Sequence, residues 1–489
     1  MLDTIIKNVR VVRPNQSSVD TVDVGIQDGK FVEISEGGEA IAPDQGKTII
    51  DGQNRLAFPG LVDAHMHIGI YQPLDQDAVT ESKAAAMGGV TTSLNYIRTG
   101  QYYLNKGGPY RDFFPDVLAL SDGNFYVDYG YHLAPISPQH IDEMPQLAQE
   151  FGVTSFKIFM FYGGHGLHGL SSQQNLFLMI NKEDRYDFAH FEFIMRQLSQ
   201  MLADHPSARN VLSLSLHCEI ADILTAYTKR VQDEGTLTGL EAYSAARPPH
   251  SEGLAVCIAS YLAHETNCVN INLLHLSSRK ALEAALMMQS TFPHINFRRE
   301  VTVGHLLLDV NAPTGKWAKV NPPIRPRKDV EFLWNAVLNR QVDWIVSDHA
   351  CCSAEQKASR INPDNIWLAK SGFGGTEYLL SGVFSEGTKR GMTYHHIAEV
   401  LSWNPAQRFG LPQKGDIAVG YDADLVLFDP DECFVVAAAN SESQQGYTPF
   451  EGMELTGRVK QTFLRGQLIY DNGTVVGEPR GQYLKRAYG

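Results

Sequence analysis

Cys-x-x-Cys pairs, runs of basic residues and long hydrophobic runs are all missing from this sequence. Its six cysteines include no Cys-x-x-Cys pair, which excludes the usual zinc-finger and redox motifs. In a chain of 489 residues, so few cysteines are typical of a protein whose thiols stay reduced in the cytosol. The cysteines are therefore expected to be free thiols.

The other two absences bear on partners and location. No stretch of about 18 apolar residues could cross a bilayer, and the N-terminal segment MLDTIIKNVRVV lacks the apolar core of a signal peptide. Lys and Arg total 41 against 55 Asp and Glu, which gives a formal net charge of -14. Because phosphate groups need clustered Lys and Arg, we expect a cytoplasmic protein that binds neither nucleic acid nor a membrane.

The sequence does contain enough apolar material for a large core, since 43% of its residues are hydrophobic. Short alternating apolar and polar runs, separated by Gly, Asp and Asn, fill residues 1–58 and return in residues 412–478. This pattern is typical of antiparallel strands and turns. The two segments predict one small β-sandwich domain that is discontinuous in the chain, with residues 479–489 as a C-terminal tail.

Residues 59–411 have a different rhythm, in which short apolar runs alternate with longer amphipathic ones. Such alternation is typical of βα units and a parallel sheet. Eight βα repeats predict a closed (β/α)8 barrel, the TIM barrel of the α/β class. The eight candidate strands are residues 61–68, 89–97, 127–136, 153–160, 211–219, 269–278, 295–303 and 343–350.

Side chains that bind metals lie in the later part of five of these strands. The first strand ends with His65 and His67, and their i, i+2 spacing puts both imidazoles on one face. The active site of such a barrel lies at the C-terminal ends of its strands, so these side chains are expected to converge. Imidazole together with carboxylate predicts a metal site, suited first to zinc and also to manganese, iron or nickel. The remaining members of the set are Lys157, His217, His275 and Asp348, in the fourth, fifth, sixth and eighth strands.

Lys157 lies within the apolar segment FKIFM, where a buried ammonium group without a partner would be costly. One interpretation is an ion pair with a nearby aspartate such as Asp348. The other is that the lysine reacts with carbon dioxide and becomes a carbamate, an anionic group able to bridge two metals. The residues by themselves leave both interpretations open.

Several stretches of the chain resemble the cyclic amidohydrolase branch of the amidohydrolase superfamily. That branch contains the dihydropyrimidinases, hydantoinases, allantoinases and dihydroorotases. The matching stretches follow one another across nearly the whole chain, and the C-terminal one is long and specific. They are PGLVDAHMHI, AAAMGGVTTSLNY, GVTSFKIFMFY, SLHCE, NLLHLSS, WIVSDHA and SWNPAQRFGLPQKGDIAVGYDADLVLFDP.

The resemblance implies two divalent metal ions per chain, zinc being the first expectation, bridged by a carboxylated Lys157. His65 and His67 would bind the first metal, whereas His217 and His275 would bind the second. The resemblance also makes Asp348 a ligand of the first metal and the acid and base of the reaction. Relatives form dimers and tetramers, so a homo-oligomer, dimer or tetramer, is expected.

The implied reaction opens the C–N bond of a cyclic amide that resembles hydantoin or a dihydropyrimidine. A hydroxide that bridges the metals would attack the ring carbonyl. Tyr162, five residues after the bridging lysine, would contact the substrate and steady the oxyanion. Asp348 would carry the proton to the leaving ring nitrogen.

The sequence departs from these relatives around the expected substrate. Dihydroorotases carry an arginine where Gly69 stands, which disfavours that activity, although Arg98 could take its place. In hydantoinases and dihydropyrimidinases, the backbones of a Ser-Pro-Pro and an Asn-Gly segment hold the imide. The equivalents here are Asn321-Pro322-Pro323 and Ser371-Gly372. We therefore expect Asn321 and Ser371 among the substrate contacts, with the substrate itself left open.

Two unusual loops follow the predicted strands. Residues 98–114 are aromatic and basic and could line the pocket or an oligomer interface. Residues 163–170, GGHGLHGL, could form a lid over the pocket or a solvated loop. His165 and His168 in this second loop could contact substrate but are not expected to bind metal.

Other functions fit the same residues. An amidohydrolase that acts on a linear urea or an N-acyl amide, or on allantoin, would use the same metal pair. A non-catalytic scaffold related to dihydropyrimidinase would have lost metal ligands, whereas this chain retains all six. Metal content would distinguish the scaffold from the enzymes.

Overall fold

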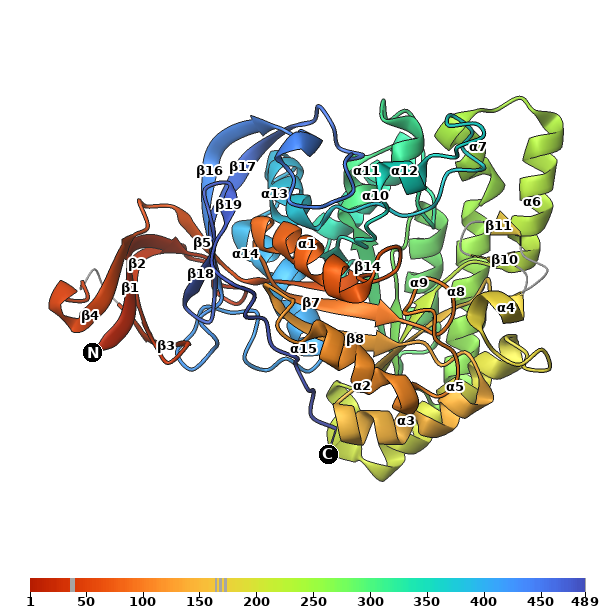
Figure 1. Cartoon of the computed structure of the whole chain (residues 1–489), viewed down its shortest axis with the longest axis horizontal. Helices are drawn as coiled ribbons and strands as arrows, with labels where there is room; N and C mark the ends of the chain where they lie inside the picture. Colours follow the sequence, from red (N-terminus) through yellow and green to blue (C-terminus); the bar gives the residue numbers. More distant parts are fainter. Residues whose placement is uncertain (36–39, 163–164, 167–168, 171–173, 489) are drawn as a thin grey trace.

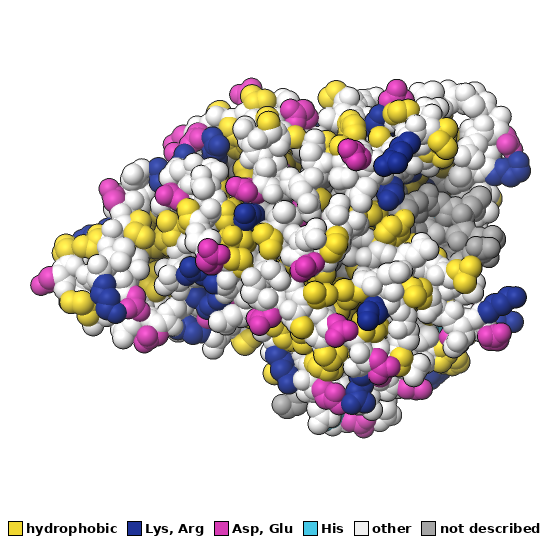
Figure 2. Space-filling model, viewed as in Figure 1, with side chains coloured by type: hydrophobic (Ala, Val, Ile, Leu, Met, Phe, Trp, Pro, Cys, Tyr) yellow, Lys and Arg dark blue, Asp and Glu magenta, His cyan; other side chains and the backbone are white. Residues whose placement is uncertain are grey.

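Two parts make up the protein, a mixed sheet that contains the N-terminus and a barrel covered by helices (Figure 1). The computed structural model describes residues 1–35, 40–162, 165–166, 169–170 and 174–488. No helix in these ranges is long and apolar enough to cross a membrane. On the face drawn in Figure 2, Lys and Arg side chains lie interspersed with Asp and Glu side chains across the described surface.

The barrel consists of eight parallel strands, and each begins and ends within a few residues of the predicted bounds. The sheet runs in the order β15-β14-β13-β12-β9-β8-β7-β6. It closes where Met66 forms a parallel bridge with His349 and the His67 amide donates to the His349 carbonyl at 2.7 Å. The strands are β6 (Leu61–Met66), β7 (Val90–Ile97), β8 (Asp128–Leu133), β9 (Ser155–Phe159), β12 (Ser213–His217), β13 (Asn270–Leu273), β14 (Asn296–Thr302) and β15 (Trp344–Val346).

Because these strands are buried on both faces, their sequences are short, nearly continuous apolar runs. Every residue of β6, β7, β8, β9 and β12 is buried, as expected when helices cover the outside of a parallel sheet and side chains fill the inside. The predicted fold class, a (β/α)8 barrel with a small β-sandwich domain formed by the N- and C-terminal segments, is confirmed, and the terminal domain contains one mixed sheet.

Helices surround the barrel, and several begin at side-chain caps that the sequence provides. The Ser137 side chain accepts from the His140 amide at the start of α3, and Gly152 ends that helix at φ 69°. The helices are α1 (Leu74–Met87), α2 (Tyr110–Ser121), α3 (Pro138–Phe151), α4 (Gln174–Leu178), α5 (Phe188–Asp204), α6 (Ala221–Glu234), α7 (Gly239–Ala246), α8 (Pro249–Thr266), α9 (Arg279–Thr291), α10 (Val303–Leu307), α11 (Arg327–Leu338), α12 (Ala354–Lys357), α13 (Leu379–Lys389), α14 (Tyr394–Ala398) and α15 (Asn404–Arg408).

The two ends of the chain join in one mixed sheet of nine strands. Its order is β19-β18-β17-β16-β5-β1-β2-β3, with β4 beside β1. Antiparallel pairing of β5 with β16 connects the N-terminal to the C-terminal segment. The strands are β1 (Leu2–Val11), β2 (Asp20–Gln27), β3 (Lys30–Ile34), β4 (Gly46–Asp51), β5 (Leu56–Pro59), β16 (Leu425–Val435), β17 (Glu454–Leu464), β18 (Gln467–Asp471) and β19 (Thr474–Val475).

This sheet has an apolar core of its own, in which Ile6 and Ile26 pack with Leu425 and Phe463. Neither terminal segment supplies all of these side chains, so each needs the other to bury its apolar face. The division of the chain at residues 58 and 411 stays a prediction.

The C-terminal tail lies against the barrel. Its backbone exchanges hydrogen bonds with Tyr129 of β8 through Gln482 and Leu484. Arg486 is buried and donates to the Tyr131 carbonyl and the Ser155 hydroxyl. The tail thereby covers part of the barrel wall on β8 and β9.

Candidate metal centre and substrate pocket

The strands deliver the predicted ligand residues to one end of the barrel. His65 lies in β6, Lys157 in β9 and His217 at the end of β12. His275 and Asp348 follow β13 and β15, with φ values of 34° and 53°. Positive φ is strained for residues other than glycine, and such strain is often found at functional sites.

His65, His67, Lys157 and Asp348 are in direct contact. Asp348 Oδ1 lies 3.0 Å from His65 Nε2 and 3.3 Å from His67 Nε2. Lys157 Nζ lies 3.0 Å from His65 Nε2. Within the described residues, no carboxylate comes within ion-pair distance of Lys157 Nζ, so the geometry does not support the predicted pairing with Asp348.

His217 and His275 complete the cluster. Their ring centroids lie 4.4 Å apart, and the His275 ring lies 5.3 Å from that of His65. Ligand atoms of His65, His275 and Asp348 all lie within 4.8 Å of one another. His275 Nδ1 is buried and has no hydrogen-bond partner in the described part of the chain. A buried nitrogen without a partner fits a metal ligand, because such atoms are otherwise almost always satisfied.

The protonation states favour metal binding. Burial lowers the pKa of His217 and His275 well below the usual range, which keeps the imidazoles neutral. Burial alone would raise the pKa of Asp348, but contacts with His65 and His67 hold it well below its usual range. Burial also lowers the pKa of Lys157 to about 7. The carboxylates of Asp348 and Glu300 outweigh burial at His65 and raise its pKa. Neutral imidazole and ionised carboxylate are the forms that bind metals, so His217, His275 and Asp348 fit a divalent cation.

Two buried glutamates, which the sequence analysis missed, orient the histidines. Glu300 of β14 lies 2.7 Å from His65 Nδ1, and Glu219 lies 2.7 Å from His217 Nε2. A carboxylate on the far nitrogen fixes the tautomer and direction of a ligating histidine. Glu219 is signalled by its i+2 spacing from His217, but nothing in the local sequence marks Glu300. Arg247 Nε in turn donates to Glu219 Oε1 at 3.0 Å.

A pocket of about 510 Å³, measured out to open solvent, opens beside this cluster. Five of the six predicted metal ligands and all three predicted substrate residues line it. The lining residues are His67, Ile70, Tyr71, Arg98, Tyr103, Lys157, Phe159, Phe161, Tyr162, His217, His275, Val320, Asn321, Asp348, Ala350, Ser371 and Gly372.

Hydrogen bonds fix the predicted substrate contacts in place. The Tyr243 hydroxyl donates to Asn321 Oδ1 at 2.5 Å and lies 3.3 Å from the Ser371 hydroxyl. The Tyr71 hydroxyl donates to the Ser371 carbonyl at 3.0 Å. Two tyrosines therefore hold the side chains and backbone of this wall of the pocket.

Two buried lysines support the same wall from behind. Lys319 Nζ donates to the carbonyls of Ile366 at 2.8 Å and Ala369 at 2.5 Å. Lys357 Nζ donates to the carbonyls of Lys319 and Gly372. Burial lowers the pKa of Lys319 to about 6 and that of Lys357 to about 7. The segment 366–372 thus owes its position to side chains that do not reach the pocket.

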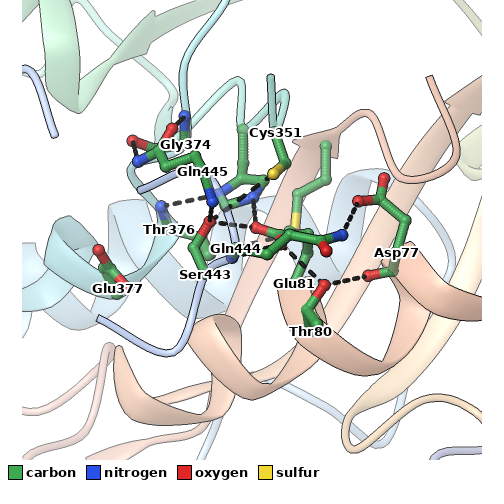
Figure 3. Close-up of polar contacts among 12 residues, drawn as sticks. Asp77, Thr80, Glu81, Cys351, Gly374, Thr376, Glu377, Ser443, Gln444 and Gln445 are labelled. Atoms are coloured by element: carbon green, nitrogen blue, oxygen red, sulfur yellow. Dashed lines mark hydrogen bonds and ion pairs between the residues drawn. The ribbon is translucent and has the colours of Figure 1, made fainter. Parts of the chain in front are cut away.

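Glu81 of α1 lies in a separate buried network with Ser443 and Gln444 (Figure 3). His349, the neighbour of Asp348, belongs to the same network. Glu81 accepts hydrogen bonds from His349 Nε2 at 2.7 Å, the Ser443 hydroxyl at 2.6 Å and the Gln444 amide at 3.2 Å. His349 Nδ1 accepts from two backbone amides of the turn at residues 375–376. Both ring nitrogens of His349 are satisfied, so its role is to hold the backbone beside Asp348.

The two unusual loops differ in their relation to the pocket. Arg98 and Tyr103, from residues 98–114, line the pocket, and the Tyr103 hydroxyl lies 2.7 Å from His67 Nδ1. His165 is buried in β10 (His165–Gly166), which pairs with β11 (Gly169–Leu170), and it does not line the pocket. His168 lies outside the described residues.

Comparison with known proteins gives the family of the chain. The profile of the Amidohydrolase family matches residues 219–469. A D-hydantoinase from Geobacillus stearothermophilus is 30% identical over 497 aligned positions, which cover 99% of this chain and 96% of the relative. An allantoinase from Salmonella choleraesuis (strain SC-B67) is 30% identical over 99% of this chain and 98% of its own. A dihydropyrimidinase structure from Brevibacillus agri NCHU1002 superposes with a TM-score of 0.83 at 26% identity, covering 100% of this chain and 99% of the other.

The chain therefore belongs to the amidohydrolase family, in its cyclic amidohydrolase branch, and the resemblance drawn from the sequence is confirmed. It is an amidohydrolase of the hydantoinase, dihydropyrimidinase and allantoinase group. Family and buried cluster together indicate a metal site. Identity of about 30% does not fix which ring the protein opens.

Proposed function

We propose that this protein is a binuclear metal-dependent hydrolase that opens the ring of a cyclic amide resembling hydantoin or a dihydropyrimidine. One observation carries the proposal: the end of the barrel gathers four imidazoles, an aspartate held as a carboxylate and a buried lysine beside one pocket. The ring-opening class follows from the relatives, whose names include D-hydantoinase, allantoinase and dihydropyrimidinase.

The chain offers ligands for two metals. We assign His65, His67 and Asp348 to one ion, which we propose to be zinc, and His217 and His275 to the other. Lys157, whose Nζ contacts His65, is proposed to carry a carboxyl group that bridges them. Bound divalent metals polarise a carbonyl oxygen and lower the pKa of water.

The remaining chemistry belongs to side chains of the pocket. Hydrolysis breaks the ring C–N bond, with hydroxyl added to the carbonyl carbon and a proton to the nitrogen. Asp348, held as a carboxylate by His65 and His67, can accept a proton and pass it to that nitrogen.

Tyr162 is proposed to stabilise the oxyanion that forms on the carbonyl oxygen. Burial raises the pKa of its phenol, and Arg98 opposes that rise. The phenol remains protonated at neutral pH and can donate a hydrogen bond to developing negative charge. Asn321, Ser371 and the backbone of Gly372 form the wall against which the ring would lie.

A panel of rings tests the proposal. The protein, prepared with zinc and bicarbonate, is assayed for opening of hydantoin, dihydrouracil, allantoin and dihydroorotate, and metal content is measured on the same sample. We expect about two metals per chain and ring opening that disappears in His65→Ala. If the protein binds two metals but opens none of these rings, the proposal of a cyclic substrate is overturned and linear ureas or N-acyl amides are favoured.

The relatives also bear on assembly. We propose that the protein is a homo-oligomer, a dimer or tetramer, by analogy with its branch of the family. Light scattering on the purified protein would show a single species of at least twice the 54.3 kDa chain mass. A monomer at micromolar concentration would contradict this.

A further inference from the structure

Arg98 is a buried cation in the wall of the pocket. It follows β7 directly and is 2% exposed. In the described part of the chain, no aspartate or glutamate pairs with its guanidinium. A buried charge without a partner is strongly unfavourable, and natural proteins rarely contain one without a reason.

The immediate neighbours of Arg98 are aromatic. Its guanidinium carbon lies 4.4 Å from the ring centroid of Phe177, 5.0 Å from that of Tyr103 and 5.9 Å from that of Tyr162. Ring faces attract a cation, but they offset only part of the cost of removing it from water.

The hydrogen bonds of Arg98 are incomplete. Nη1 donates to the carbonyl of Thr99 at 2.6 Å. Nη2 is buried and makes no hydrogen bond of ordinary geometry among the described residues, and the Tyr162 phenol is a polar group beside the guanidinium. A planar guanidinium with an open donor edge suits a carboxylate, which can accept two parallel hydrogen bonds.

Arg98 also lies close to the reacting centre. Tyr103 contacts it on one side and hydrogen-bonds to His67 on the other, with 2.7 Å between the Tyr103 hydroxyl and His67 Nδ1. Tyr162, the proposed oxyanion donor, also neighbours Arg98. The cation therefore contacts the proposed oxyanion donor directly, and one tyrosine separates it from the proposed metal ligand His67.

We propose that Arg98 binds a carboxylate on the substrate, so that this protein acts on cyclic amides with an acidic substituent. The inference rests on the proposed ring-opening function and specifies its substrate class. The carboxylate would be attached to the ring directly or through a short chain, because Arg98 and the reacting groups line the same pocket. Phe177, Tyr103 and Tyr162 would shield the ion pair from water and strengthen it.

A matched pair of substrates tests this inference. Hydantoin bearing a carboxymethyl group at carbon 5 is compared with the carbamoylmethyl analogue, which has nearly the same shape and no charge. We expect the wild-type protein to open the acid with a kcat/KM at least about 10-fold above that of the amide, since a charge-assisted hydrogen bond contributes about that much. Arg98→Met should abolish the preference for the acid, and Arg98→Lys should restore part of it.

Arg111→Met is the control, because Arg111 is an exposed arginine on α2 that pairs with Glu150 outside the pocket. This variant should keep the wild-type ratio of acid to amide. Equal kcat/KM values for the two rings in the wild-type protein, or a ratio that Arg98→Met leaves unchanged, would overturn the inference.

Calorimetric binding of the same two rings separates this inference from the proposed function. The wild type could bind the acid more tightly than the amide, lose this preference in Arg98→Met and open neither ring. That result would support the carboxylate site and overturn the ring-opening function. Opening of the neutral ring with rejection of the acid would support the function and overturn the carboxylate site. The melting temperature of each variant shows whether it is folded.

Discussion

Replacing Glu300 by glutamine should weaken metal binding while the fold persists. Glu300 Oε1 faces His65 Nδ1 at 2.7 Å and accepts from the His275 amide at 3.1 Å. Glu300 Oε2 accepts from the Trp344 indole N–H at 2.8 Å. When His65 Nδ1 carries its proton, all three polar neighbours of the Glu300 side chain are hydrogen-bond donors. Only a carboxylate can accept from donors on both of its terminal atoms.

The size of the effect follows from this arrangement. The NH2 group of a glutamine at this position would face another donor. That donor is either the Trp344 indole N–H or the pair formed by His65 Nδ1 and the His275 amide. Loss of a carboxylate behind a ligating histidine lowers metal affinity about 10- to 100-fold, or about 1.4 to 2.7 kcal/mol. We expect an affinity loss of that size in Glu300→Gln and a similar one in Glu219→Gln, which affects His217.

Competition with a chromophoric zinc chelator measures this affinity. Glu331→Gln is the matched control, because Glu331 is a partly exposed residue of α11 that pairs with Arg327 and Arg390. The control should bind metal as the wild type does. Unchanged zinc affinity in a folded Glu300→Gln protein would refute the orienting role of this carboxylate.

Three further predictions concern other parts of the site. Tyr162→Phe should lower kcat for hydantoin about 100-fold with a small change in KM, as expected for loss of an oxyanion donor, and an unchanged kcat would exclude that role. Burial and the nearby Glu81 carboxylate raise the pKa of Asp77 to about 8, so the folded state holds a proton that the unfolded chain releases above about pH 4. As the pH rises from 4 to 8, the free energy of unfolding of the wild type should therefore fall relative to that of Asp77→Asn, by at most about 1.4 kcal/mol per pH unit in urea titrations. Parallel dependence of the two unfolding free energies on pH would contradict this. Lys319→Met removes the donor to the carbonyls of Ile366, Trp367 and Ala369. It should cost about 1–3 kcal/mol in urea unfolding and raise KM, whereas an unchanged KM would show that this wall of the pocket holds without Lys319.

The barrel could be predicted because each of its strands has a local signal. A buried parallel strand is a short apolar run between amphipathic segments, and all eight runs proved to be strands. The small β domain was also predictable, since its two segments share one alternating pattern. Its single mixed sheet, with β5 beside β16, depends on pairing between residues about 370 positions apart, which no local pattern specifies.

The convergence of the candidate ligands was predictable for a similar reason. His65 and His67 have strand spacing, and the other ligands recur near strand ends, so the topology of the barrel brings them together. The assignment of each to a particular metal rests on family resemblance and stays a prediction. Glu300 and Arg247 escaped notice because a buried carboxylate or guanidinium in a strand or loop has no spacing rule.

The sequence by itself thus determined the class of fold, the converging histidines and the family, because these depend on periodicity and on motifs within single strands. Only the tertiary structure decided which charges are paired and which are not. Lys157 proved to contact His65 and not a carboxylate, and Arg98 proved to be a buried cation in the pocket. Partners in a folded chain are set by packing between elements far apart in sequence, and the cost of burying a charge becomes visible only once its surroundings are known.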